Sequence, residues 1–549
     1  MDPSASGKIA ADGAVAEDSD RTRRVELLAV VSGSAHSRAF WERSLRQMAP
    51  GFDVRQTLSL HEDLPVNQAF GLLLTWDRLR GHLGPGQTAL TAFVFGEGTR
   101  ATPMTETDNG QKPAILTYVF ERDGERNRPL SMVELALSHF APIADFLTRS
   151  GFDGMVVKWG DEVLVPECDL SGVDSAFRDA DVVRFVSRCE VTAENAANKD
   201  FLAVDRDGQV KAFIPRRPIE QMYELAQRGW VDREGTRLFA SVNLGSIAVS
   251  RRLLDALLAE FRTEIFDAEA RRDQRPDLDP QFFTALCTAV CSRDFEARLE
   301  AWASQIAESP AMACLDRTLP DLFGRICRVV DAIAAKEHRP VRVRALDLGR
   351  PYWGDIGTHG SMYEFYMALL DRGARGRTAR QLAGLSGQVD ERGNLYLGRC
   401  HIAPTVTVHD SVLIDAVLLG HGRISRSVLV GTHAWDIEAE DAFDVMSTVG
   451  SLTLAPRAGS YRVIAQGPVS ASPGQRLTTL FLSEGPVLMR VNEDTDLRNR
   501  SAFYDQPVLG NPLSFADAHA RMSSLGPDDV ARRTEQVRRA VIASFPERR

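Results

Sequence analysis

The feature that most constrains the fold is an apolar segment, Leu90 to Phe95, that runs directly into a glycine-rich turn, Gly96-Glu97-Gly98. A short apolar run is typical of a buried strand, and glycine allows the backbone to turn sharply where the strand ends. Val25 to Val31 is a similar run that ends at Ser32-Gly33-Ser34 and precedes residues with helical spacing. The sequence therefore predicts strand-turn-helix units, which are typical of α/β folds.

Further strand and helix candidates alternate along the chain, which favours a mostly parallel sheet with helices on both faces. The additional strand candidates are Gly154 to Lys158, Val182 to Ser187, Phe201 to Val204 and Phe239 to Val249. Between residues 251 and 340 the pattern is helical, with apolar residues at three- and four-residue spacing. We interpret 251–340 as a helical insertion or lid.

Composition excludes several classes of protein. The chain has 549 residues, enough for two or three domains, and its net charge of −10 provides no basic field for nucleic acid or an anionic membrane. No uninterrupted apolar run approaches the roughly 18 residues of a membrane-spanning helix. Residues 1–24 lack a secretory signal pattern and are expected to be a disordered tail.

Cysteine usage favours a reducing cytoplasm, because the seven cysteines are scattered and odd in number. Cys287 and Cys291 lie four residues apart in an apolar helical segment. Two interpretations are open: a pair of metal-binding thiols, or structural cysteines buried on one helix face, which are commoner.

A second periodicity begins near Leu385, where aliphatic residues recur every six positions. They are Val406, Val412, Leu418, Ile424 and Val430. A six-residue period is typical of a β-helix, in which each hexad forms one strand of a triangular coil of eighteen residues. We expect a β-helix over 385–505 and a C-terminal helical segment over 506–549, with alternating strands in a β-sandwich as the alternative.

Three histidines in this region, His409, His421 and His433, are spaced by twelve residues. Histidine is the commonest metal ligand. However, residues twelve apart do not stack in an eighteen-residue coil, so exposed edge positions explain these histidines better than a shared site.

The glycine-rich turn also carries charged groups that suit phosphate. Gly96 and Gly98 allow successive backbone N–H groups to form an anion-binding concavity, and Arg100 and Lys112 add positive charge. The segment is not a Walker loop, because Gly-Lys-Ser/Thr is absent, and it lacks the third glycine of a dinucleotide-binding turn. Glycine spacing alone is a weak signal.

The longer segment Gly96-Glu97-Gly98-Thr99-Arg100-Ala101-Thr102-Pro103-Met104-Thr105, followed by Lys112-Pro113-Ala114, resembles the signature of the sugar-1-phosphate nucleotidyltransferases. The likeness is greatest to the glucose-1-phosphate adenylyltransferases. The resemblance implies that Gly96, Glu97, Gly98 and Thr99 wrap a nucleoside triphosphate. It also implies that Arg100 stabilises the transferring phosphoryl group and that Lys112 contacts phosphate oxygens.

Later segments match the same family in order. Gly160-Asp161 and Trp353-Gly354-Asp355-Ile356-Gly357-Thr358 resemble segments whose aspartates bind Mg²⁺ in the family. Asn243-Leu244-Gly245 resembles a segment near the sugar, and residues 204–210 match a hairpin that precedes the sugar-binding strand. The resemblance therefore implies Asp161 and Asp355 as metal ligands and Asn243 and Gly245 as sugar contacts.

Two positions depart from the family pattern. Phe95 stands where the family has a glycine, and Phe213 to Pro218 replaces an aromatic residue followed by Glu-Lys-Pro. Arg217 can still hold a sugar phosphate, but Arg216 replaces a glutamate that would accept hydrogen bonds from sugar hydroxyls. This change suggests a modified sugar, a cyclitol phosphate or a more anionic substrate; a solvated surface pair of arginines is the alternative.

The resemblance covers residues 90–440 and implies a Rossmann-like, mostly parallel nucleotidyltransferase domain over 25–384, followed by a left-handed β-helix. The expected reaction joins a nucleoside triphosphate to a sugar or cyclitol 1-phosphate and releases pyrophosphate, with Mg²⁺ as cofactor. The β-helix would support a homo-oligomer. Residues 25–89 would be an added strand-helix unit or a regulatory surface. The alternative is a non-catalytic regulatory or binding subunit of the same fold.

Overall fold

The computed structural model of the chain describes the greater part of its sequence. The described residues are 24–33, 35–48, 53–61, 68–94, 98–123, 126–267, 281–291, 295–308, 321–382, 395–397, 401–402, 407–408, 412–414, 417–418, 423–424, 427–430, 433–434, 438–440, 442–444, 448–497 and 499–544.

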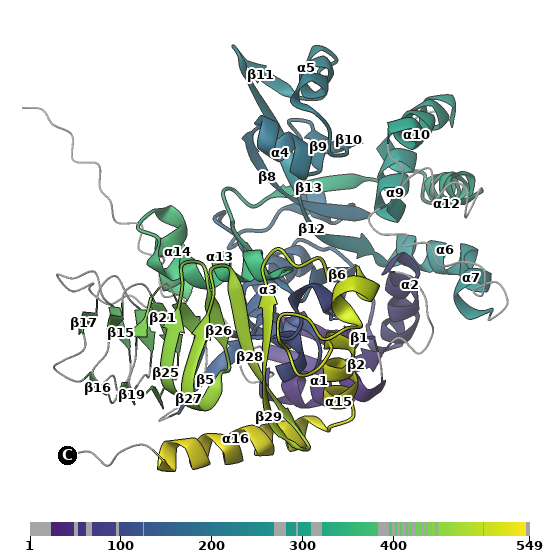
Figure 1. Cartoon of the computed structure of the whole chain (residues 1–549). Coiled ribbons are helices and arrows are strands. Elements are labelled where there is room, and N and C mark those ends of the chain that lie inside the picture. Colours follow the sequence, from purple (N-terminus) through teal and green to yellow (C-terminus); the bar gives the residue numbers. More distant parts are fainter. Residues whose placement is uncertain are drawn as a thin grey trace, which may run out of the picture.

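Ten strands of the described residues form a central sheet with the order β10-β9-β12-β6-β3-β1-β2; β11 and β8 also pair with β12, and β13 pairs with β8 (Figure 1). Their bounds are β1 (Arg24–Ser32), β2 (Asp53–His61), β3 (Thr88–Phe93), β6 (Gly154–Trp159), β8 (Val182–Glu190), β9 (Phe201–Val204), β10 (Val210–Ile214), β11 (Asp232–Glu234), β12 (Arg237–Ser250) and β13 (Val343–Asp347). Strands β2, β1, β3 and β6 are parallel neighbours, and β12 runs antiparallel to β6. The predicted α/β fold with a largely parallel, Rossmann-like sheet is confirmed.

Helices cover both faces of this sheet, because its strands are apolar on both sides. In β1, Ala29 and Val31 belong to one buried cluster, whereas Leu28 and Val30 belong to the other. The first face is covered by α2 (Gln68–Leu79), α6 (Arg251–Glu260), α7 (Arg262–Phe266), α9 (Gln281–Cys291) and α12 (Leu322–Glu337). The second face is covered by α1 (Ala35–Met48), α3 (Met132–Arg149), α4 (Ala193–Asn198) and α5 (Ile219–Gln227).

Residues 25–89 form part of this sheet. Strands β1 and β2 extend it on the far side of β3, with α1 and α2 on opposite faces. The strand predicted over Val25 to Val31 is confirmed, whereas β2 was not predicted, because DVRQTLSLH carries too many polar residues for an apolar run.

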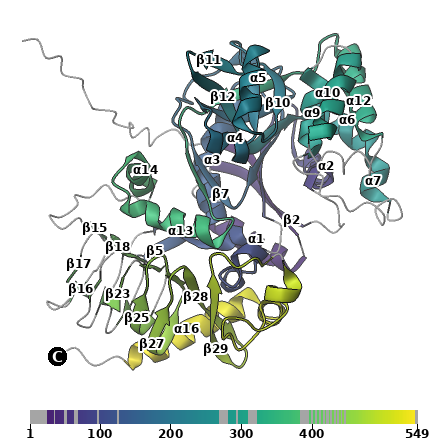
Figure 2. The same ribbon diagram turned by 45° about the horizontal axis from the view of Figure 1, so that its top comes forward.

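The segment 251–340 contains α6, α7, α9, α10 (Phe295–Glu308) and α12, which gather at one end of the molecule in both views (Figures 1 and 2). Cys287 of α9 is buried in the first core cluster, and burial raises the pKa of its thiol. The side chain of Cys291 lies outside the described residues. The position of Cys287 fits the structural interpretation.

Two short antiparallel strand pairs lie between the sheet and the C-terminal region. Strands β7 (Glu162–Val165) and β14 (Tyr352–Asp355) form one antiparallel pair, and β4 (Leu116–Asp123) and β5 (Arg126–Ser131) form the other. Helices α13 (His359–Met367) and α14 (Ala374–Leu382) follow β14. The polypeptide therefore leaves the sheet through β14 and α13 before the C-terminal strands begin.

Short parallel strands stack along the C-terminal region. They are β15 (Leu395–Leu397), β16 (His401–Ile402), β17 (Thr407–Val408), β18 (Val412–Ile414), β19 (Val417–Leu418), β20 (Arg423–Ile424), β21 (Ser427–Val430), β22 (His433–Ala434), β23 (Glu438–Ala439), β24 (Ala442–Asp444), β25 (Thr448–Leu454), β26 (Gly459–Tyr461) and β27 (Ile464–Ala471). Val412 pairs with Val428, and Ser427 pairs with Ala442. Each coil therefore contains about sixteen residues, and the eighteen-residue coil expected from the hexads is wrong.

Four of the five hexad positions, Val412, Leu418, Ile424 and Val430, lie in these strands, and Val406 lies outside the described residues. His433 is in β22, where its backbone pairs with Val417 and Thr448, whereas His409 and His421 lie outside the described residues. The parallel stack ends in an antiparallel hairpin, β28 (Gln475–Leu482) and β29 (Gly485–Asn492). The expected β-helix region, 385–505, is therefore not parallel throughout.

Helices α15 (Phe515–Ser523) and α16 (Pro527–Ala543) follow this hairpin and lie near α1 in both views (Figures 1 and 2). The Arg43 guanidinium of α1 forms an ion pair with Asp528 of α16. Among the described residues, no helix has both the length and the apolar character needed to cross a bilayer.

Candidate active site

The glycine-rich turn lies at the carboxyl end of β3, the edge of a parallel sheet where ligands of α/β proteins usually bind. Phe95, Gly96 and Glu97 lie outside the described residues. Gly98 has a φ of +60°, and a Cβ there would lie 2.9 Å from Thr105 Cγ2. Gly98 is therefore required both by its left-handed backbone and by the side chains packed beside it. Thr99 and Arg100 follow in one 3₁₀ turn, and Arg100 is exposed.

Lys112 lies beside the same turn, because the buried loop after Arg100 brings the chain back to it. Its aliphatic chain packs beside Gly98, since a Cβ at Gly98 would lie 3.4 Å from Lys112 Cγ. Its ammonium Nζ lies 3.8 Å from Asp161 Oδ2. The lysine side chain is only 9% exposed, whereas the aspartate side chain is 31% exposed. The structure thus brings together Gly98, Lys112 and Asp161, three of the residues predicted from the sequence.

Asp161 follows β6, as predicted, and Gly160 before it fits tightly against the end of β3. The Gly160 N–H donates to the Phe93 carbonyl at 3.0 Å, and a Cβ at Gly160 would lie 2.8 Å from Val94 Cγ1. A larger residue would press on the Val94 side chain and the Phe93 carbonyl. The glycine therefore places Asp161 beside the glycine-rich turn.

The second predicted metal ligand lies on the neighbouring strand. Asp355 pairs with Glu162 in the β7–β14 ladder, and the Ile356 N–H donates to the Asp161 carbonyl at 3.4 Å. The backbones that carry the two aspartates are therefore adjacent. Two carboxylates suit Mg²⁺, which usually takes one or two from the protein and the rest of its ligands from phosphate and water. Among the described residues, no cluster of three or more metal-binding side chains is present.

Asn243 and Gly245 lie at an irregularity of β12, where its pairing with β8 shifts register between Asn243 and Ile247. Gly245 has a φ of +79°, and a Cβ there would lie 3.4 Å from the Trp159 ring and 3.7 Å from Glu162 Oε2. Gly245 is thus next to the strand that follows Asp161. The Asn243 side chain accepts a hydrogen bond from buried Arg184 at 2.6 Å, so its amide oxygen already has a donor.

Arg216 and Arg217 follow β10 at the same end of the sheet. Asp200 joins Arg216 to Asn243: its carboxylate accepts from the Arg216 N–H at 3.2 Å, and its carbonyl accepts from the Asn243 N–H at 2.9 Å. The Arg217 Nε donates to the Pro215 carbonyl at 3.1 Å, and its backbone N–H donates to Ala196. The hairpin predicted over 204–210 is confirmed as the turn between β9 and β10.

Two lysines near the site were not predicted. Lys199, directly before β9, places its ammonium 4.0 Å from the centre of the Trp353 ring, two residues before Asp355. Lys158 of β6 is fully buried, with Nζ 3.5 Å from Glu162 Oε2 and 5.6 Å from the Phe140 ring. The sequence signal for Lys158 is a charged residue inside the apolar strand GMVVKW. Lys199 has no such signal, because only the fold brings it to Trp353.

The C-terminal region holds the loop between Gly98 and Lys112. Buried Asp108 forms an ion pair with Arg462 and accepts a hydrogen bond from the Tyr461 hydroxyl. His519 Nδ1 of α15 lies 3.0 Å from the Glu106 carboxylate. From the other side, Trp41 Nε1 of α1 donates to the Gln111 side chain at 2.8 Å. Groups from distant parts of the chain therefore hold the loop that carries Lys112.

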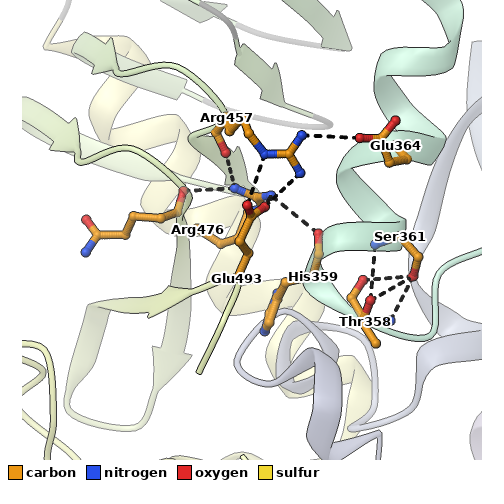
Figure 3. A network of polar contacts seen from close by, with 8 residues as sticks. Thr358, His359, Ser361, Glu364, Arg457, Arg476 and Glu493 are labelled. Carbon is orange, nitrogen blue, oxygen red and sulfur yellow. Dashed lines mark hydrogen bonds and ion pairs between the residues drawn. The ribbon is translucent and has the colours of Figure 1, made fainter. Parts of the chain in front are cut away.

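The same region also holds α13, which begins four residues after Asp355 (Figure 3). Arg457 and Arg476 both bind the Glu493 carboxylate and lower its pKa, and each guanidinium lies 4.9 Å from the Tyr363 ring. Arg476 also donates to the His359 carbonyl at 3.4 Å. The first turn of α13 is thereby joined to the C-terminal strands.

His359 connects α13 to the loop between Gly98 and Lys112. Its Nε2 lies 2.9 Å from the Thr102 carbonyl, so this nitrogen donates, and the imidazole is 2% exposed. Burial, and next the positive charge of Arg476, lower the pKa of His359 to about 4. The histidine is therefore neutral at pH 7 and acts as a hydrogen-bond donor between the two segments.

Comparison with known proteins adds no assignment. No protein-family model matches the chain, and no curated protein matches its sequence.

Proposed function

We propose that this chain is a Mg²⁺-dependent nucleotidyltransferase that joins a nucleoside triphosphate to a sugar or cyclitol 1-phosphate and releases pyrophosphate. The observation that carries the proposal is the meeting of Lys112 with Asp161, beside Gly98 and next to the backbone of Asp355. These residues are far apart in sequence but meet at the carboxyl edge of the sheet. The resemblance to sugar-1-phosphate nucleotidyltransferases predicts the same set.

The chemistry follows from the charges. In this proposal the backbone from Gly96 to Thr99 cradles the triphosphate, while Lys112 and Arg100 stabilise negative charge on the transferring phosphoryl group. Asp161 and Asp355 would hold Mg²⁺, which when bound neutralises charge on the phosphate oxygens. The sugar phosphate is already an anionic nucleophile, so the protein needs no strong base. Catalysis then consists of in-line positioning and electrostatic stabilisation.

The stacked C-terminal strands fit a supporting role in the same proposal. We propose that they form a left-handed β-helix, which would supply the surface for a homo-oligomer. The scattered cysteines are those expected of a cytoplasmic enzyme.

Pyrophosphate release tests the proposal directly, with a panel of nucleoside triphosphates and sugar or cyclitol 1-phosphates, with and without Mg²⁺. We expect Lys112→Met and Arg100→Ala each to lower turnover by about 10²- to 10³-fold, as loss of one charge-stabilising donor does in other enzymes. Asp161→Asn should raise the Mg²⁺ concentration needed for half-maximal rate. Lys336→Met, which removes an exposed charge on α12, is the control.

Two outcomes would contradict the assignment. Full activity of Asp161→Asn at low Mg²⁺ would exclude Asp161 as a metal ligand. No pyrophosphate release with any pair of substrates would favour a non-catalytic binding subunit.

A further inference from the structure

Two positively charged side chains, Lys199 and Arg216, lie on the side of the candidate site proposed for the sugar, and they have few acidic neighbours. The Lys199 ammonium contacts the Trp353 ring and forms no hydrogen bond or ion pair with any described residue. The Arg216 side chain is 64% exposed, and its one carboxylate neighbour among the described residues is Asp200, whose Oδ1 lies 3.6 Å from Arg216 Nε. Among the described residues, Asp200 is thus the single carboxylate in ion-pair contact with Arg216, and none is in such contact with Lys199.

The fold holds both cations at the same end of the sheet. Lys199 and Asp200 directly precede β9, and Arg216 follows Pro215 at the end of β10, which is antiparallel to β9. The Arg216 backbone is fixed by its hydrogen bond to Asp200, and Lys199 is fixed by Trp353. The Lys199 side chain is therefore held against the ring, and the Arg216 side chain starts from a fixed backbone position.

The two cations lie beyond the groups proposed to act on phosphate. Strand β8 pairs with one edge of β12, and β6 and β9 share the other edge, β6 along Ile247 to Ser250 and β9 along Ser241 and Val242. Asp161 follows β6 and Lys199 precedes β9, so the two residues lie on either side of the β12 irregularity that contains Gly245. Between them, Gly245 leaves space beside the Trp159 ring. A ring seated against Gly245 with its 1-phosphate toward Asp161 would direct its far substituents to Lys199 and Arg216.

The positive charges of Lys199 and Arg216 determine which substituents on the far side of the ring they can bind. Lysine and arginine donate hydrogen bonds and accept none, so they suit a group that only accepts. Neutral hydroxyls would leave two positive charges beside one carboxylate, and an amino sugar would add a third. A carboxylate supplies two acceptor oxygens and one negative charge, and arginine binds it with two parallel hydrogen bonds.

Resting on the proposed function, we propose that the substrate carries a carboxylate on its ring, as a uronic acid 1-phosphate does, and that Lys199 and Arg216 bind it. Lys199 and Arg216 then determine specificity and take no part in phosphoryl transfer. The Trp353 ring holds Lys199 in place, since an ammonium over an indole face is stabilised by the ring electrons.

The test compares substrates that differ only at C6. Pyrophosphate release is measured with glucuronic acid 1-phosphate against glucose 1-phosphate, and with galacturonic acid 1-phosphate against galactose 1-phosphate. For at least one pair, we expect the uronate to have a kcat/KM at least about tenfold higher, because a hydrogen-bonded ion pair is lost with the neutral sugar. Lys199→Met and Arg216→Gln should each lower kcat/KM for the uronate by about 10- to 100-fold and bring the two sugars close together.

Two further variants separate recognition from folding. Arg216→Glu introduces an acceptor for hydroxyls and should reverse the preference toward the neutral sugar, a gain that a misfolded protein does not show. Lys211→Met removes a lysine of β10 that is 51% exposed and paired with Asp205. This control should leave the preference unchanged.

The outcomes distinguish this proposal from the one on which it rests. Turnover of neutral sugar 1-phosphates with equal or higher kcat/KM in the wild type would overturn the carboxylate assignment and leave nucleotidyl transfer intact. Equal losses for both sugars in Lys199→Met and Arg216→Gln would also overturn it. No turnover with any sugar phosphate would show that the proposed function itself fails.

Discussion

The candidate site has a side that the proposed function assigns to phosphate and a side that it assigns to sugar, here called the phosphate side and the sugar side, and the two are built in opposite ways. On the phosphate side, Lys112 lies in a loop whose carboxylates are buried and have partners, since Asp108 forms an ion pair with Arg462 and Glu106 is hydrogen-bonded to His519. On the sugar side, the Arg216 side chain is mostly exposed, and the Lys199 ammonium lies against the Trp353 ring without an ion pair to any described residue.

This difference indicates which interactions maintain the fold and which are left for a ligand. Buried charges must be paired within the protein, because removing them from water is costly. An exposed charged group stays solvated, so leaving it unpaired costs little free energy, and it remains available to bind a ligand. The C-terminal region therefore contributes to the phosphate side, which is the rigid side of the site. The edge strand β10 and its neighbour β9 contribute the sugar side, which is the open side.

The largest effect is expected for Asp108→Ala on the rigid side. The substitution leaves the Arg462 guanidinium buried without its carboxylate, which typically costs about 3–5 kcal/mol in the free energy of unfolding. Urea denaturation measures this loss. Asp529→Ala, which removes an exposed ion pair with Arg532 on α16, should change stability by less than about 1 kcal/mol. A similar small loss for Asp108→Ala would remove the contrast between the two sides.

The second effect is the pH dependence caused by His359, also on the rigid side. Its folded pKa of about 4 lies below the unfolded value of 6.5, so the unfolded chain binds the proton more readily. The associated stability is complete above pH 6.5 and is lost as pH falls toward 4. We expect a loss of about 2 kcal/mol between pH 8 and pH 5.

His359→Gln keeps a donor for the Thr102 carbonyl but cannot titrate, so this part of the pH dependence should disappear. Urea denaturation of both proteins at pH 8 and pH 5 measures the difference. Equal pH dependence in the two proteins would show that the imidazole is not kept neutral by burial.

The third effect tests the packing of the glycine-rich turn. Gly98→Ala must adopt a φ of +60° and bring a methyl group to 2.9 Å from Thr105, which we expect to cost about 1–3 kcal/mol and to lower turnover. Gly86 is a matched control, with a φ of +74° and no atom within 4 Å of a Cβ. Gly86→Ala therefore measures the backbone cost alone. An equal loss of stability in both variants would mean that the Thr105 side chain moves aside at no cost in free energy.

Some of this architecture was predictable from the sequence because it depends on local pattern. Apolar runs ending in glycine predicted β1, β3 and β6, and the Gly-Asp pair after β6 predicted the place of Asp161. The hexads predicted short strands at Val412, Leu418 and Ile424, but the true repeat of about sixteen residues depends on how the coils stack.

Other features were not predictable because they depend on contacts between distant segments. Nothing near Asp108 in the sequence indicates a buried ion pair, since its partner Arg462 is more than 350 residues away. Lys199 and Trp353 are likewise joined only by the fold. A polar strand such as β2 cannot be predicted from its own residues, because its pairing with the parallel strand β1 determines its conformation.

The smallest effect on stability is expected for Arg216→Gln on the open side. Its single ion pair, with Asp200 at 3.6 Å, is exposed to solvent and contributes less than about 1 kcal/mol, while its backbone hydrogen bond to Asp200 is kept. Thermal unfolding of Arg216→Gln beside Asp108→Ala gives the comparison in one experiment. A destabilisation of Arg216→Gln as large as that of Asp108→Ala would show that the arginine maintains the fold, and the sugar side would then resemble the phosphate side after all.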